Sequence, residues 1–131
     1  MHELETWVEM TLSSSSDYLF SIHIDGQHIG NVKLGGVDQI AGHADIGLII
    51  GNRKYWGKGI GRKVINMTSH YAKNELGLTK LIAGIDVENR ASLISFTREN
   101  FIIYEYAKNY DLDTHGNFRN GVMLARNLLK L

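Results

Sequence analysis

The sequence predicts an α/β fold in a single domain that spans residues 1–131. Short apolar runs typical of strands alternate with longer runs that carry apolar residues at helical spacing. The pair Asp25-Gly26 separates two early strand-like runs, as the turn of a β-hairpin does. No repeat, linker or low-complexity segment interrupts this order, and a chain of this length can bury one core.

The helices are recognised by their apolar stripes. Residues 1–12 form the first predicted helix, and a polar break at residues 13–17 ends it. The second spans residues 61–76 and ends at Gly77, a residue suited to a helix C-cap. The third is short and spans residues 90–99. The stripe of the first helix is Leu4, Trp7, Val8 and Leu12, and that of the second is Ile60, Val64, Thr68, Tyr71 and Ala72.

The strands are recognised by apolar runs of four to ten residues that are bounded by glycine or polar clusters. Residues 35–42 are predicted to form a loop, and a loop with His115 and Gly116 precedes the last strand. The predicted strands are 18–24, 29–34, 44–50, 80–87, 101–110 and 121–126.

Composition limits the classes of function. Lysine plus arginine equals aspartate plus glutamate at 14 each, so no net charge attracts nucleic acid or an anionic membrane. The sequence contains no apolar run near 18 residues and does not begin with a signal peptide. It contains no cysteine, and its histidines lack metal-site spacing, so we expect neither disulfides nor a metal centre. A cytoplasmic protein is therefore expected.

The segment from Tyr55 to Lys63 is the strongest functional signal. It places three glycines and three cations between a strand-like run and a helix-like run. Glycines let backbone N–H groups approach a ligand, and the helix start adds unpaired donors, so the segment is typical of a phosphate site. The alternative is a glycine-rich surface turn. The segment is not a P-loop, because Lys58 precedes Gly59 rather than Ser or Thr, and Gly61 comes too early for a dinucleotide fingerprint.

The sequence motif W-G-K-G-I-G resembles the acyl-coenzyme A loop of the GCN5-related N-acetyltransferases (GNAT). Its family pattern, (Gln/Arg)-x-x-Gly-x-(Gly/Ala), falls on residues 56–61, with Trp in place of Gln or Arg. Within the family, the motif Y-W-G-K-G-I-G resembles that of the branch that includes ribosomal-protein and amino-sugar acetyltransferases. The resemblance implies a GNAT fold whose mixed central sheet is splayed at the acyl-CoA cleft. The implied loop contacts to acetyl-CoA are Trp56, Gly57, Lys58, Gly59, Ile60, Gly61 and Arg62.

The start of the chain departs from the family pattern. Family members usually open with a strand and one or two helices, whereas residues 1–12 leave room for the last helix alone. We therefore expect the usual first strand to be missing, which would leave an exposed sheet edge. A partner subunit, as in a homodimer, or another segment would then cover that edge.

The strand before the loop has two distinct faces. Its even-numbered residues are apolar, and the opposite face begins with His43, Asp45 and Gly47. The resemblance implies a bulge in this strand and pairing of pantetheine with Leu48, Ile49 and Ile50. Gly84 in the neighbouring strand suits the same narrow cleft. Simple close packing is the alternative explanation for both glycines.

The segment from Asp86 to Ser92 resembles the family pattern D-x-x-N-x-x-S. Asn89 would open a helix beside the cofactor, and it is also a good N-cap. Phe96 stands on the same helix face as Asn89 and Ser92, and the resemblance implies that all three contact acetyl-CoA. Many members carry at the position of Phe96 the tyrosine that protonates the thiolate. Phenylalanine cannot do this, so the resemblance implies Ser92 as the proton donor. The alternative for Ser92 is a solvated helix residue.

The resemblance implies an acetyl-CoA-dependent N-acetyltransferase. Transfer to an amine needs a base, and Asp45 is the first candidate, with His43 as the alternative because of its ordinary pKa. Without cysteine, direct transfer in a ternary complex is favoured over a cysteine acyl-enzyme. The expected acceptor is a small amine or amino sugar. The alternatives are a protein N-terminus as acceptor, and a non-catalytic acyl-CoA-binding or assembly module.

Overall fold

The computed structural model of the chain describes residues 6–12 and 16–131. Its strands and helices follow the alternation that the sequence predicts, with one exception at the start. In chain order they are β1 (Thr6–Leu12), β2 (Tyr18–Ile24), β3 (Gln27–Asp38), β4 (His43–Ile50), the short 3₁₀ helix η1 (Arg53–Tyr55), α1 (Ile60–Asn74), β5 (Lys80–Asp86), α2 (Arg90–Arg98), β6 (Ile102–Leu112) and β7 (Phe118–Asn127).

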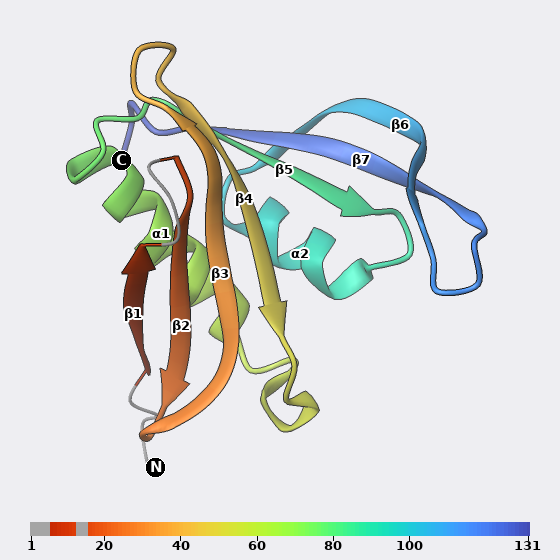
Figure 1. Cartoon of the computed structure of the whole chain (residues 1–131), viewed down its shortest axis with the longest axis horizontal. Helices are drawn as coiled ribbons and strands as arrows, with labels where there is room; N and C mark the ends of the chain where they lie inside the picture. Colours follow the sequence, from red (N-terminus) through yellow and green to blue (C-terminus); the bar gives the residue numbers. More distant parts are fainter. Residues whose placement is uncertain (1–5, 13–15) are drawn as a thin grey trace.

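The described strands form one mixed sheet of seven strands in the order β1-β2-β3-β4-β5-β7-β6. Its single parallel pair is β4 with β5. Within the described residues these two strands pair at His43–Asp45 and 80–82, and then they separate. Figure 1 shows them diverging, with β4 continuing beside β3 and β5 beside β7. The predicted mixed sheet, splayed between these two strands, is confirmed.

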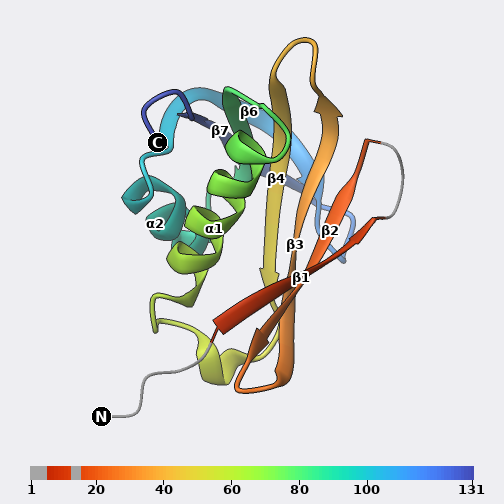
Figure 2. The ribbon, with the colours of Figure 1, turned by 90° about the vertical axis from the view of Figure 1, so that its left-hand side faces the viewer.

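Both α1 and α2 lie on one face of the sheet (Figure 2). The predicted stripe of α1 faces the core: Val64, Thr68 and Ala72 are buried. Tyr71 is half-buried and packs edge-on against Phe20, with ring centroids 5.1 Å apart. Gly77 follows α1 with a positive φ of 66°, as expected of its C-terminal position. In the described part of the chain, no helix is long and apolar enough to cross a membrane.

The prediction of a helix at residues 1–12 is wrong for residues 6–12, the part of it that the structure describes. Residues Thr6–Leu12 form β1, an edge strand that pairs antiparallel with β2 along its whole length. Leu4 lies outside the described residues. The physical reason is that β2 offers a row of unpaired backbone groups, and β1 is rich in residues that suit strands, with two Thr, Val and Trp. Long-range pairing therefore overrides the helical spacing. The expectation that the first strand is missing is also wrong, because β1 forms the edge of the sheet beside β2.

The second difference concerns irregularities in the sheet. The bulge expected in β4 is absent from the described pairing, because residues 45–50 run in continuous register with β3. The register shift lies instead between Gly35 and Asp38 of β3, within the segment that was predicted to be a loop. Gly36 has a positive φ of 56°, so the irregularity falls where the backbone conformation favours glycine. β3 is consequently a strand up to Asp38.

Candidate functional site

A cavity of ≈ 500 Å³ opens between the end of β4, the start of α1 and the start of α2. We call it the loop cavity. It brings together three segments that are separated in the sequence, as the resemblance implied. Its lining residues are Leu48, Ile49, Ile50, Tyr55, Trp56, Gly57, Gly59, Ile60, Gly61, Arg62, Asn89, Ala91, Ser92, Ile94, Ser95 and Arg98.

The glycines of the loop serve two different physical needs. Gly57 and Gly59 have φ values of 72° and 76°, a backbone conformation that other residues adopt with strain. Gly61 lies in a close contact, because a Cβ there would lie 3.2 Å from the Ser95 hydroxyl oxygen and 3.5 Å from a methyl carbon of Leu48, so the Ser95 side chain would have to shift. Gly59 is the N-cap of α1, and no side chain among the described residues caps that helix end. The first-turn N–H groups of α1 and its dipole therefore favour an anion in the loop cavity.

Trp56 ties the loop to the end of β4. Its indole N–H donates a hydrogen bond of 2.7 Å to the carbonyl of Ile50, while half of the side chain stays exposed. The Arg53 guanidinium lies 5.4 Å from the centre of the indole ring, a cation–π contact. The residue that replaces the family's Gln or Arg thus anchors the loop beside the cavity. Lys58 is exposed between Gly57 and Gly59 and is not part of the cavity wall.

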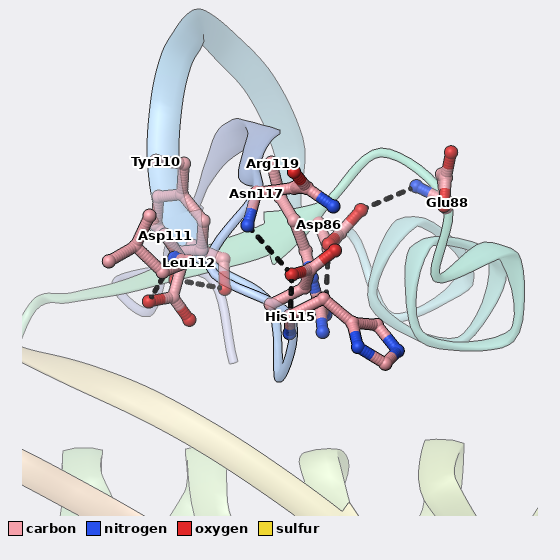
Figure 3. A network of polar contacts seen from close by, with 10 residues as sticks. Asp86, Glu88, Tyr110, Asp111, Leu112, His115, Asn117 and Arg119 are labelled. Atoms are coloured by element: carbon pink, nitrogen blue, oxygen red, sulfur yellow. Dashed lines mark hydrogen bonds and ion pairs between the residues drawn. The ribbon is translucent and has the colours of Figure 1, made fainter.

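The segment from Asp86 to Ser92 runs from the end of β5 into the start of α2, and Figure 3 shows its residues Asp86 and Glu88. The Asp86 carboxylate accepts a 2.8 Å hydrogen bond from the backbone N–H of Glu88 and lies 3.2 Å from the Arg119 guanidinium. The Asn89 side chain accepts from the backbone N–H of Ser92 at 3.2 Å. Asn89 is therefore the N-cap of α2 and also lines the loop cavity, so both of its predicted roles are compatible.

The residues of α2 divide between the cavity and the core. Ser92 is half-buried in the cavity wall, one turn before Ser95. Phe96 points away from it: its side chain is 2 % exposed and packs edge-on against Phe101, with centroids 5.0 Å apart. The structure therefore does not bring Phe96 to the cavity, and we assign it no contact with a ligand. The physical reason is that the cavity is lined mainly by Ala91, Ile94, Ser95 and Arg98, which share one side of α2, and Phe96 lies on the other side, toward the core.

Arg62 is held at the cavity wall by an ion pair. Its Nε lies 3.1 Å from a carboxylate oxygen of Glu99, at the end of α2. Arg98 also lines the cavity and is exposed. Two guanidinium groups thus stand at the wall where α1 begins, which suits a phosphate-bearing ligand.

A second hollow of ≈ 540 Å³ lies beside the gap between β4 and β5. We call it the Asp45 hollow. On β4 the Asp45 hollow is lined up to Gly47 and the loop cavity from Leu48 onward, so the two adjoin neighbouring stretches of this strand, at and beyond the last pair with β5. The lining residues of the hollow are Asp17, Lys33, Gly35, Gly36, Asp45, Ile46, Gly47, Gly84, Tyr110 and Met123.

The two candidate bases are placed differently. Asp45 is exposed in the hollow, whereas His43 is half-buried at the start of β4, where it pairs with Asp38 and Lys80. His43 does not belong to the wall of either cavity. The geometry thus favours Asp45 for contact with a molecule in the hollow.

The two glycines of the splayed strands also differ. A Cβ on Gly47 would meet no atom within 4 Å, so close packing does not explain this glycine, and the open space of the hollow lies beside it. A Cβ on Gly84 would lie 2.6 Å from the hydroxyl oxygen of Tyr110, so here close packing is the explanation. That hydroxyl donates a 2.9 Å hydrogen bond to the Gly84 carbonyl.

Sequence reasoning did not assign Ser95 or Ile94 to a site. The resemblance implied that the strand with Tyr104, Tyr106 and Tyr110 bounds the acceptor pocket, and an ordinary amphipathic strand was the alternative favoured for it. Ser95 follows Ser92 by three residues, so helical spacing from a predicted site residue could have indicated it. The sequence could not show that Tyr110 is the tyrosine that reaches β5, because Gly84 lies 26 residues away from it along the chain.

Comparisons with known proteins agree with this arrangement. A family model described as an acetyltransferase (GNAT) domain matches residues 1–98. An "uncharacterized N-acetyltransferase p20" of Bacillus licheniformis is 31% identical over 93 residues, which are 66% of this chain and 52% of the relative. The chain thus spans about half the length of that curated relative.

Solved structures share the fold. That of a probable acetyltransferase has a TM-score of 0.83 and 23% identity, and the match covers 89% of this chain and 65% of that one. The dodecameric structure of spermidine N-acetyltransferase from Vibrio cholerae, in an intermediate state, has a TM-score of 0.81 and 21% identity. That match covers 89% of this chain and 68% of the other.

Proposed function

The chain belongs to the GNAT acetyltransferase family, and on this premise we propose that it transfers an acetyl group from acetyl-CoA to a primary amine. The acceptor is a small amine or an amino sugar. The observation that carries the proposal is the presence of two cavities along neighbouring stretches of β4, at residues 45–47 and 48–50, where β4 leaves β5. A donor and an acceptor entering from the two cavities would meet at this gap.

The loop cavity has the features that acetyl-CoA requires. Gly57 and Gly59 hold the loop in a conformation that exposes backbone donors, and the start of α1 offers its N–H groups to the pyrophosphate. Arg62 and Arg98 are placed to bind phosphate oxygens. Pantetheine would lie along Leu48 and Ile49. Ile50 lines the same wall, but its carbonyl already accepts the Trp56 indole N–H. Acetyl-CoA supplies the activated acetyl group as a thioester.

The chain's own residues then supply the proton transfers. Asp45 accepts a proton from the acceptor ammonium, directly or through water, and the neutral nitrogen attacks the thioester carbonyl carbon. A backbone N–H of the splayed strand polarises the carbonyl oxygen. As the carbon–sulfur bond breaks, Ser92 donates a proton to the sulfur. The attacking nitrogen releases its second proton to solvent, from which Ser92 regains one. The products are the N-acetylated amine and coenzyme A, formed in a single ternary complex.

The first test is calorimetric titration with acetyl-CoA, with ATP and a dinucleotide as controls. Selective binding is expected. Gly59→Glu should abolish it, because a carboxylate would stand where an anion binds. An amine panel, with a protein N-terminal peptide included, is then assayed for release of coenzyme A thiol. Absence of acetyl-CoA binding by the unmodified chain would overturn the proposal.

One observation favours a second candidate, a non-catalytic acyl-CoA-binding module. Phe96 lies in the core, so the position at which many family members carry a tyrosine supplies no hydroxyl to the cavity. Tight acetyl-CoA binding without thiol release across the whole panel would support this alternative. Thiol release that Ser92→Ala reduces would support the enzyme.

The proposed reaction uses acetyl-CoA, a cytoplasmic metabolite, so the proposal places the protein in the cytoplasm. A homodimer is the assembly we expect. Its support is the outer strand β6 with its neighbour β7, which expose large apolar side chains such as Ile102 and Phe118, 72% and 67% exposed. Light scattering at two protein concentrations would test this, and a monomer at both would contradict it.

A further inference from the structure

Tyr110 is built into the Asp45 hollow by the strands around it. It belongs to β6, and its ring crosses β7 at Gly121 to reach β5 at Gly84. A Cβ at Gly121 would lie 2.7 Å from the ring, and one at Gly84 would lie 2.6 Å from the hydroxyl oxygen. The ring can therefore occupy this place only because both positions are glycine.

The hydroxyl of Tyr110 has a defined orientation. It donates to the Gly84 carbonyl at 2.9 Å, which directs its proton toward β5 and leaves oxygen lone pairs as acceptors. Burial, followed by the negative charges of Asp111, Asp45 and Asp86, raises the pKa of Tyr110 above its ordinary value of 10.0. The hydroxyl thus keeps its proton at neutral pH and acts as a neutral acceptor toward the hollow.

The hollow has an excess of negative charge. Its charged side chains are Asp17, Lys33 and Asp45. The Lys33 ammonium lies 3.8 Å from the Asp17 carboxylate, so these two charges offset each other. The backbone N–H of Gly36 also donates to Asp17. The carboxylate of Asp45 is left to attract a cation.

Building on the proposed function, we infer that Tyr110 is a specificity-determining residue. Its hydroxyl oxygen accepts an N–H of the acceptor, while the Asp45 carboxylate attracts the acceptor's positive charge. The substrate class that follows is a cationic primary amine without a carboxylate next to the amino group. A free amino acid would bring its own carboxylate against Asp45, which disfavours it.

The test compares Tyr110→Phe with Tyr106→Phe by steady-state kinetics. Tyr106 is a matched control, because it is an exposed tyrosine of the same strand that does not line the hollow. Tyr110→Phe keeps the ring over the glycines and removes the hydroxyl. The acceptors are glucosamine, glycinamide and glycine, and the last two differ mainly in the carboxylate.

The expected result is a rise of about tenfold in the KM for amine with Tyr110→Phe, the effect of losing one hydrogen bond to a charged group. The KM for acetyl-CoA should stay unchanged, and Tyr106→Phe should behave as the unmodified chain. Glycinamide should be used at least about tenfold better than glycine, which reflects one unfavourable charge contact. Melting temperatures of all variants separate a loss of fold from a loss of recognition.

Failure of this inference is distinguishable from failure of the proposed function. If the unmodified chain acetylates amines and Tyr110→Phe leaves the amine KM unchanged, the role of Tyr110 is overturned and the function stands. Equal use of glycine and glycinamide would overturn the substrate class. If no amine is acetylated, binding of the amine to the complex of the chain with coenzyme A is measured instead. The measurement is the change in NMR chemical shift of the Gly47 and Gly84 amides when amine is added. If the amine changes these shifts and Tyr110→Phe makes the changes smaller, the role of Tyr110 stands and the catalytic function does not. If the amine causes no change, both the role of Tyr110 and the proposed function are overturned.

Discussion

At the scale of single residues, several positions around the site are glycine, and the physical reason differs between positions. Gly57 and Gly59 are required by backbone conformation, whereas Gly84 and Gly121 are required by the atoms that lie where a Cβ would be, and Gly61 lies in a close contact. The sequence shows all five glycines alike. Their separate reasons could not be predicted from it, because the contacting atoms of Ser95 and Tyr110 come from other elements.

This difference predicts opposite effects of the same substitution. Gly59→Ala should lower the free energy of unfolding by about 1–2 kcal/mol, because alanine is strained at a φ of 76°. Gly47→Ala is the control: a Cβ there meets no atom within 4 Å, and alanine in a strand interior should raise stability by about 0.5–1 kcal/mol. Urea unfolding measures both. Equal stability of the two variants would contradict the assignment.

At the scale of helices and strands, the sequence signals for helix caps gave correct predictions, whereas the assignment of the first segment of the chain was wrong. Asn89 begins α2 and Gly77 follows α1, because the chemistry of a cap is local. Residues 1–12 were misassigned because the edge of β2, which pairs with β1, is not visible in a local pattern. The loop segments after β3 and β6 likewise begin later than predicted, since strand pairing continues to Asp38 and Leu112.

The N-cap of α2 can be tested by a substitution and a rescue. Asn89→Ala should cost about 1 kcal/mol of unfolding free energy, because the backbone N–H of Ser92 loses its acceptor. Asn89→Asp retains the acceptor and should restore most of that stability. Thermal unfolding is the measurement. If both variants are equally destabilised, the hydrogen bond is not what matters at this position.

The turn between β6 and β7 should depend on pH. The Asp113 carboxylate accepts hydrogen bonds from the backbone N–H groups of Asn117 and His115, at 2.9 and 2.8 Å. The bond from Asn117 is the main cause that lowers the pKa of Asp113 below 3.8. A lowered pKa means that the turn gains stability above the ordinary value and loses it as pH falls through the lowered one.

Hydrogen exchange of the His115 and Asn117 amides measures this effect. Their protection should be constant near neutral pH and should fall in strong acid, after the intrinsic exchange rate is corrected for pH. In Asp113→Asn the acid-induced loss should disappear. Protection that is independent of pH in the unmodified chain would contradict the prediction.

At the scale of the whole molecule, the parting of β4 and β5 is the feature on which function depends. It places the loop cavity and the Asp45 hollow next to each other, and α1 and α2 pack together beside it. Glu99 links these parts, because it binds Arg62 of the cavity wall and also acts on Arg126. Burial lowers the pKa of Arg126, and the charge of Glu99 offsets part of that effect. Arg126 itself is 4% exposed and donates to the Ser69 hydroxyl at 3.0 Å.

A double-mutant cycle can measure the link between α1 and α2. The variants are Arg62→Met, Glu99→Gln and their combination. The pair should show a coupling energy of about 0.5–1 kcal/mol, a small value because Arg62 is 43% exposed and the charges are screened. Glu99→Gln should also weaken acetyl-CoA binding, because it releases Arg62 from the cavity wall. Zero coupling together with unchanged binding would show that the ion pair has no structural role.

The sequence by itself determined the order of strands and helices after residue 17, the glycine loop before α1 and the N-cap of α2. It also determined the family to which these segments point, the GNAT acetyltransferases. Each depends on residues close together in the chain, where spacing and backbone preference act directly. Tertiary structure alone decided that Phe96 is core, that Asp45 rather than His43 lines a hollow, and that Tyr110 reaches Gly84. These outcomes depend on pairing registers and on the twist that separates β4 from β5. They are set by contacts between distant segments, which carry no periodic signal in the sequence.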